Sequence, residues 1–285
     1  MLYTAFMADI VNSKKLLKED REQIQIFIKL CLGTLNNIFK PSLEFDVIFS
    51  AGDEVQGLFK SPTSAFLYLR LFKMILSPLQ IRCGIGVGEW DVRIPNGTSS
   101  EQDGPAYHNA RAAILNAHDR NDYSVLFNSN NENDIYINTL ANMSFLFAKK
   151  QSQYQNQVLL LTELLIPLFD SNAMDLQAFA QIFTLIQNKV DQEFYIFTKN
   201  KSESKIDLFN KIPTDFEPFY VFSPSILESG FTLTSTLKKG LSTKISNITN
   251  TSRQNIDNVI KTANIAEIRN IDLTTLLFIY KTFVG

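Results

Sequence analysis

The chain has 285 residues, of which 45% are hydrophobic, and a formal net charge of -2 at pH 7. This length allows one large domain or two ordinary ones with a sizeable core, and it excludes a single small module. The nearly neutral charge excludes a strongly basic coat for nucleic acid over the whole surface, so any basic patch must be local.

Cysteine use and hydropathy indicate a cytoplasmic protein. Cys31 and Cys83 lie within apolar helix and strand patterns, which favours buried, inert thiols in a reducing compartment. The most apolar long run, residues 158–169, is interrupted by Thr162, Glu163 and Pro167. It is far shorter than the roughly 20 residues that cross a bilayer. No secretion signal is recognisable at the N-terminus, so we expect no membrane partner.

Strand and helix patterns alternate in the first part of the chain. Strands are predicted at residues 3–9, on both sides of Gly52-Asp53, at 79–88 and at 123–127, and helices at 20–39, 63–76 and 105–117. Small residues within 79–88 indicate close approach of another backbone. The βαββαβ order predicts an α+β, ferredoxin-like domain of the cyclase or palm type over residues 1–130.

The remainder of the chain is predicted to be mostly helical. Residues 131–235 form a connecting region with helical periodicity over 135–169 and 175–191, in which 149–157 reads as an exposed stretch of one long helix. A short strand is expected at 219–222. Residues 236–285 are predicted to form a helix-turn-helix domain, with helices at 240–248 and 253–264. This end carries a local net charge of +4 over residues 237–285.

Two carboxylates are the strongest candidates for chemistry. Asp9 ends the first strand and Asp53 lies in the turn of the following hairpin. In a βαββ sheet these side chains would come close enough to share one or two cations, and oxygen ligands suit Mg²⁺ or Mn²⁺. Such a metal would hold a nucleoside triphosphate and stabilise the leaving pyrophosphate. Glu54 is either a third ligand or an exposed strand residue.

Polar groups near these carboxylates could bind phosphate. The turn after the first strand carries Asn12, Ser13 and Lys14, whose backbone N–H groups and ammonium could cradle phosphate oxygens. Arg82 and Arg111 could clamp a triphosphate, because a guanidinium holds phosphate in a bidentate fork. The alternatives are a polar turn and ordinary surface or core arginines.

Four sequence blocks, read together, resemble the SatD family. They cover residues 8–14, 52–59, 82–88 and 103–111, in the order of that family. A helix-turn-helix at the C-terminus is also similar to the layout of the family. The resemblance is specific over roughly the first 130 residues and looser afterwards.

The same blocks more distantly resemble class III nucleotidyl cyclases and GGDEF diguanylate cyclases. This resemblance implies that Asp9 and Asp53 hold two metal ions, that the Ile10 carbonyl is a further ligand, and that Glu54 matches the GGDEF glutamate. It also implies catalytic roles for His108, Asn109 and Arg111 in stabilising the transition state, and a homodimer, since such cyclases build their sites between two subunits. Three departures weigh against turnover. Ala51 replaces the first glycine of the GGDEF motif, His108 stands where class III cyclases have an asparagine, and Arg111 lies one position early.

The C-terminal helices could read DNA. Ser252 is expected to cap the second helix, whose first turn presents Arg253, Gln254 and Asn255 to base edges in the major groove. Lys244 and Lys261 would contact phosphates. The alternative is a packing or dimerisation module.

The sequence therefore predicts a nucleotide- and metal-binding regulator of transcription, with a purine nucleotide and DNA as candidate partners. The alternative is an active nucleotidyl cyclase or nucleotidyltransferase that makes a cyclic nucleotide signal. Both hypotheses require the Asp9 and Asp53 side chains to converge on a shared cation. They fail if these side chains lie far apart, point away from each other or are engaged with arginines in a closed ion network.

Overall fold

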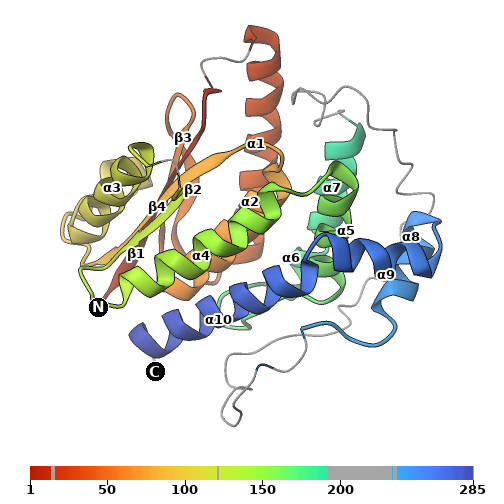
Figure 1. Cartoon of the computed structure of the whole chain (residues 1–285). Helices are drawn as coiled ribbons and strands as arrows, with labels where there is room; N and C mark the ends of the chain where they lie inside the picture. Colours follow the sequence, from red (N-terminus) through yellow and green to blue (C-terminus); the bar gives the residue numbers. More distant parts are fainter. Residues whose placement is uncertain (14–16, 121, 192–232, 234–235, 285) are drawn as a thin grey trace.

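The computed structural model describes residues 1–13, 17–120, 122–191, 233 and 236–284 (Figure 1). The helices and strands follow in the order β1 (Tyr3–Ile10), α1 (Lys18–Phe39), β2 (Leu43–Ala51), β3 (Glu54–Phe59), α2 (Pro62–Leu76), β4 (Ile81–Gly88), α3 (Pro105–His118), β5 (Val125–Asn128), α4 (Asp134–Lys149), α5 (Gln153–Leu165), α6 (Leu176–Phe179), α7 (Gln181–Asp191), α8 (Leu241–Thr249), α9 (Arg253–Thr262) and α10 (Ile265–Phe283). The predicted α+β class is confirmed.

The five strands form one sheet in the order β2-β3-β1-β4-β5. All neighbouring strands are antiparallel except β4 and β5, which run parallel. The central strand β1 lies between β3 and β4, so its C-terminal end is beside the turn that joins β2 to β3. This pairing brings the ends of three strands together at one edge of the molecule.

The period-2 alternation of β1 divides the core into two parts. Phe6, Ala8 and Ile10 point into the main core with α1 and α2, whereas Ala5 and Met7 belong to a smaller cluster beneath α3. Figure 1 shows α3 on one side of the sheet and the other helices on the opposite side. Asp9 continues the alternation on the side of α3.

Glycines of β4 allow α3 to lie unusually close to the sheet. A Cβ atom on Gly84 would lie 2.3 Å from the Ala110 carbonyl oxygen, and one on Gly86 would lie 2.1 Å from the Ala110 nitrogen. The facing residues of α3, Ala106 and Ala110, are also small and fully buried. The predicted close approach of another backbone to this strand is therefore confirmed.

Four charged side chains are buried in the main core and neutralise one another. Arg70 of α2 donates to both carboxylate oxygens of Glu163 at 3.1 Å and to Asp272 at 2.7 Å. Arg269 of α10 also pairs with Glu163. Burial alone would raise the pKa of Glu163, but Arg269 and Arg70 lower it to about 2. We call these four residues the buried charge cluster.

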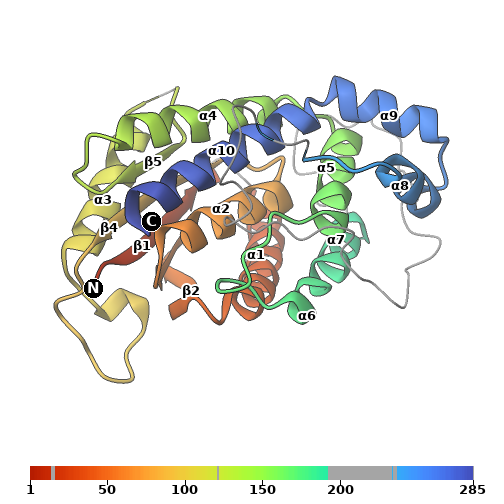
Figure 2. The same ribbon diagram turned by 90° about the horizontal axis from the view of Figure 1, so that it is seen from below.

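The last helix returns to the sheet domain. α10 packs along α4 and α2, and it approaches β5 through contact of the Phe283 ring with Phe127 (Figure 2). One continuous set of buried apolar residues extends from Phe6 to Ile279. The division into domains at 130 and 235 stays a prediction, as do the ferredoxin-like classification and the helix-turn-helix.

The prediction of one long helix through residues 149–157 is wrong. α4 ends at Lys149, and α5 begins at Gln153 behind Ser152, which forms a capping box with Gln155. Asn156 and Gln157 are buried rather than exposed. The capping hydroxyl starts a new helix because it satisfies a backbone N–H that a continuous helix would bond internally. The strand expected at 219–222 lies outside the described residues.

Both cysteines are free and buried, as predicted. Within the described ranges, every helix is too short or too polar to span a bilayer. The cytoplasmic location stays a prediction.

We expect Gly86→Ala to destabilise the protein by about 3 kcal/mol or more, because the new methyl group would meet the backbone of α3 rather than a movable side chain. Gly33→Ala is the matched control. Gly33 lies in α1 with nothing within 4 Å of an added Cβ, so this change should stabilise the protein by about 0.5–1 kcal/mol. Urea unfolding of both variants measures the difference. Equal effects would show that α3 does not pack this closely.

Candidate functional site

The C-terminal end of β1 carries a carboxylate that is paired with an arginine. Asp9 stands opposite Arg82 in the register of β1 with β4. The Arg82 Nε donates to the Asp9 Oδ1 at 2.9 Å, and both side chains are about one fifth exposed. Arg82 therefore pairs with Asp9 in this structure, and its predicted role in holding phosphate stays a prediction.

Asp53 lies in the tight turn between β2 and β3. Gly52 adopts a φ of +61°, a conformation that side-chain-bearing residues rarely take, which explains a glycine at this position. Asp53, Asp9 and Ile10 line one cavity of about 10 Å³, roughly the space of one water molecule. The three predicted metal-binding residues are thus brought together. Asp53 makes no hydrogen bond or ion pair with any residue that the structure describes.

The two carboxylates interact electrostatically. Burial raises the pKa of Asp9, the hydrogen bond and charge of Arg82 lower it, and the negative charge of Asp53 raises it again. The net pKa is above the usual value, so Arg82 does not fully compensate Asp9. A cation between the two carboxylates would offset both the cost of burying the Asp9 charge and the repulsion between the two negative charges.

The composition of the site limits how a metal could be held. The described residues contain no group of three or more His, Cys, Asp or Glu side chains suited to a metal ion. A cation here would have two carboxylates, completed by a backbone carbonyl such as that of Ile10 and by water. This oxygen-only set with retained water fits Mg²⁺ better than it fits Zn²⁺.

Glu54 and Arg111 are bonded to each other. The Arg111 guanidinium donates to the two carboxylate oxygens of Glu54 at 2.7 and 2.8 Å, in a bidentate pair that joins α3 to β3. Arg111 is 45% exposed and Glu54 is 21% exposed. The pair lies on the α3 side of the sheet, as does Asp9, so it borders the candidate site.

His108 and Asn109 lie within one turn before Arg111 on α3, and Asn109 is beside the C-terminal part of β4. The His108 Nε2 is 2.9 Å from the Asp103 carboxylate, and the ring is 69% exposed. Asn109 donates to the Val87 carbonyl at 2.8 Å and accepts from Asn130. Asn109 therefore holds α3 to the sheet, and neither side chain is placed with Asp9 and Asp53.

The predicted phosphate-binding turn is described only in part. Asn12 is exposed and has a left-handed φ of 61°, which asparagine tolerates better than most residues. Ser13 is buried. Lys14 lies outside the described residues. The turn follows directly from Asp9 and Ile10, so its backbone is close to the carboxylates.

The residues predicted to contact DNA lie on α8 and α9. Ser252 caps α9 by accepting from the Asn255 N–H, as predicted. The side chains at the surface are Lys244, Arg253, Gln254, Asn255 and Lys261. Arg253 is 3.5 Å from Asp257, and Asn255 donates to the Tyr154 hydroxyl. Ile256 and Val259 face inward, so the polar side of α9 is turned away from the core.

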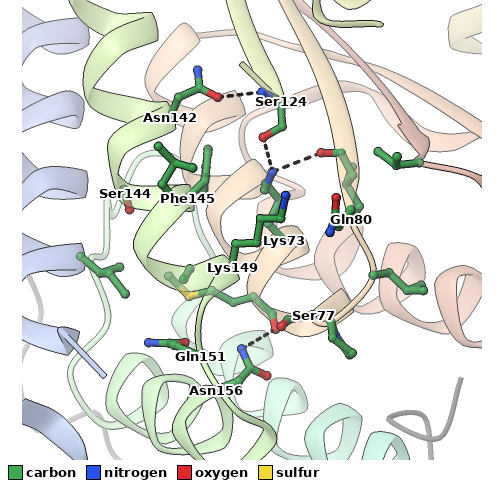
Figure 3. Close-up of a pocket in the computed structure, with 18 of the residues that line it drawn as sticks. Lys73, Ser77, Gln80, Ser124, Asn142, Ser144, Phe145, Lys149, Gln151 and Asn156 are labelled. Carbon is green, nitrogen blue, oxygen red and sulfur yellow. Dashed lines mark hydrogen bonds between the residues drawn. The ribbon is translucent and has the colours of Figure 1, made fainter. Parts of the chain in front are cut away.

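A second cavity was not predicted from the sequence. It measures about 190 Å³ and lies between α2, α4 and the starts of β4 and β5 (Figure 3). Lys73 is its central charged residue. The available signal was a pair of basic residues, Arg70 and Lys73, in the otherwise apolar second half of α2.

Comparisons with known proteins support a family and report a partial structural likeness. The sequence model of the SatD family matches residues 3–209. Two solved structures of a bacterial light-regulated adenylyl cyclase match at 15% and 17% identity, with TM-scores of 0.32 and 0.30. They cover 45% and 44% of this chain, and 42% and 74% of their own chains.

A third solved structure is the catalytic core of a rhodopsin-guanylyl cyclase with converted specificity in complex with ATPαS. It matches at 15% identity with a TM-score of 0.28, over 40% of this chain and 71% of that chain. The present chain thus spans less than half of the first cyclase structure. A comparison with curated proteins gives no match.

We expect two substitutions to move the pKa of Asp9 in opposite directions. Arg82→Gln should raise it because an attractive charge and a hydrogen bond are lost, and Asp53→Asn should lower it because a repulsive charge is lost. The carboxyl ¹³C shift of Asp9 followed against pH measures both.

The raised pKa of Asp9 also determines whether stability rises or falls with pH. Because the folded-state pKa of Asp9 is above its ordinary value, the folded state binds more protons, and this residue's contribution to stability should fall as pH rises from the ordinary value through the raised one. Asp53→Asn should narrow the pH range over which this contribution falls, because it lowers the raised pKa of Asp9. An unchanged Asp9 pKa in this variant would mean that the carboxylates do not interact.

Proposed function

Since this chain belongs to the SatD family, we propose that it binds a purine nucleotide together with Mg²⁺ or Mn²⁺ at the site around Asp9 and Asp53. The observations that carry the proposal are that Asp9, Ile10 and Asp53 line one cavity and that the charge of Asp53 acts on the Asp9 carboxyl. Hard divalent cations prefer such oxygen ligands and bridge them to phosphate oxygens. The bound cation would neutralise the triphosphate and orient it.

The arginines fit a site for an anionic ligand. Among the described residues, Arg82 bonds to Asp9 through Nε, and its two terminal nitrogens have no described partner, so they could bind phosphate. Arg111 is partly exposed at the border of the site. A cation that binds Asp9 would compete with Arg82, and the guanidinium could then turn toward a phosphate group. Asn12, Ser13 and Lys14 would complete the phosphate-binding turn.

We infer that the protein senses a nucleotide rather than converting it. Of the proposed catalytic residues, His108 is engaged by Asp103 and Asn109 holds α3 to β4. Neither contacts Asp9 or Asp53. The alternative, an active cyclase or nucleotidyltransferase with a ferredoxin-like palm domain, requires these residues to act from a second subunit. A homodimer is part of both proposals.

The C-terminal segment is proposed to be a DNA-reading helix-turn-helix. α8 and α9 are separated by three residues, and the first turn of α9 exposes Arg253, Gln254 and Asn255. Arg, Gln and Asn can read base edges in the major groove, and lysines such as Lys244 and Lys261 can contact the flanking phosphates. The protein would then regulate transcription in response to a nucleotide.

Nucleotide binding is tested by calorimetric titration with ATP and GTP in the presence and absence of Mg²⁺ or Mn²⁺. We expect metal-dependent binding that Asp53→Ala and Asp9→Ala each weaken by about tenfold or more, because each removes a charged ligand oxygen. Asp46→Ala is the matched control, since Asp46 is an exposed carboxylate elsewhere on β2.

The same mixtures are analysed for pyrophosphate and for cyclic or linked products. Binding without product supports a sensor, whereas product that disappears in Asp53→Ala supports the enzyme. Binding that survives the double substitution of Asp9 and Asp53 would show that the carboxylates do not form the site.

DNA binding is tested by fluorescence anisotropy with promoter fragments at low and moderate salt. Arg253→Ala should weaken binding by about 1–3 kcal/mol if the side chain contacts a base. Lys281→Ala removes the same charge at the far end of α10 and should have little effect (Figure 2). Equal losses indicate general electrostatic attraction, and no binding at low salt identifies α8 and α9 as an interaction module.

A further inference from the structure

The second cavity has the construction of a ligand site. Its wall combines apolar side chains, such as Met74, Leu79 and Phe145, with polar groups near Lys73. Figure 3 shows that the labelled side chains come from separate elements and surround a common space.

Lys73 is fixed in a position where its charge has no acidic partner. Its ammonium donates to the Ile81 carbonyl at 3.1 Å and to the Ser124 hydroxyl at 3.0 Å, and it lies 4.4 Å from the centre of the Phe145 ring. An ammonium has three N–H groups, so two hydrogen bonds leave one for a ligand. Within the described residues, Lys73 forms no ion pair.

The charged groups around Lys73 make an anion favourable. Burial lowers its pKa to about 8, the Cys83 thiol on β4 opposes this shift, and Lys149 on α4 adds to it. Burial raises the pKa of Cys83, so that thiol stays neutral. Asp122 also lines the cavity but is exposed and makes no ion pair with a described lysine. Two ammonium groups, those of Lys73 and Lys149, thus line the cavity and repel each other, and no described carboxylate pairs with Lys73.

We propose that this cavity binds a small organic carboxylate with a compact apolar body, its carboxylate between Lys73 and Lys149. The volume of about 190 Å³ is slightly larger than an engineered cavity of about 150 Å³ that holds benzene. A ring or branched chain fits the apolar wall, and the charge fits the lysines. Val11, two residues after Asp9, lines the same cavity, so such a ligand would contact the chain segment that carries the first carboxylate.

The probe is benzoate, added to the full-length protein and followed by calorimetry and by saturation-transfer NMR. We expect a Kd on the order of 1 mM or tighter for a ligand of this size. Benzamide has nearly the same shape without the charge and should bind at least about tenfold more weakly. Binding in the native protein should weaken as pH rises through about 8, because Lys73 then loses its charge.

Lys73→Met should weaken benzoate binding by about tenfold or more, and Lys149→Met should weaken it to a smaller extent. Lys150→Met is the matched control because Lys150 is the next residue in the chain but does not line the cavity. Thermal unfolding confirms that the variants fold, and the pH profile of the native protein needs no variant.

The proposal is overturned if benzoate does not bind, if benzamide or inorganic phosphate binds as tightly, or if Lys150→Met has the effect of Lys73→Met. The experiment contains no nucleotide or divalent metal. Its result is therefore independent of the function proposed for Asp9 and Asp53.

Discussion

The buried charge cluster is the interaction on which the arrangement of the chain depends. Arg70, Glu163, Arg269 and Asp272 come from α2, α5 and α10, and their two positive and two negative charges balance. Removing one member of such a cluster leaves an uncompensated charge in the core, at a cost of about 3–5 kcal/mol. The C-terminal helix α10 is therefore held to α2, which packs against the sheet, and to α5.

This constraint links the three candidate sites. α2 carries Arg70 and, one turn later, Lys73 of the second cavity, while its Phe72 lines the small cavity beside Asp9 and Asp53. α5 carries Glu163 and also packs against α8 and α9. Two routes connect the sheet to α8 and α9: one runs through α2 and α5, and the other through α4 and α10, which packs against α9. A regulator with a ligand-binding sheet and a DNA-reading end would need such a shared framework.

Local features were predictable from the sequence, and long-range pairings were not. Periodicity gave β1, α1, α2 and α3 nearly to their ends, and Ser252 was recognisable as a cap because capping depends only on the next three residues. The pairing of Asp9 with Arg82 depends on the register of β1 with β4, which no local pattern specifies. The partners of Arg70 lie 93 and 202 residues away. A lone charge in an apolar run has the same appearance whether it meets solvent or a buried partner.

The ion pairs at the candidate nucleotide site bear on how its ligands would bind. Arg82 pairs with Asp9 and Arg111 pairs with Glu54, whereas Asp53 forms no ion pair with a described residue. A divalent cation binding to Asp9 must compete with Arg82, and this competition opposes binding of the cation alone. If the displaced guanidinium donates hydrogen bonds to a phosphate group, these bonds offset the loss of the pair between Arg82 and Asp9. The cation and the nucleotide should therefore each bind more tightly when the other is present. The cation takes the place of Arg82 at Asp9, and the phosphate takes the place of Asp9 at Arg82.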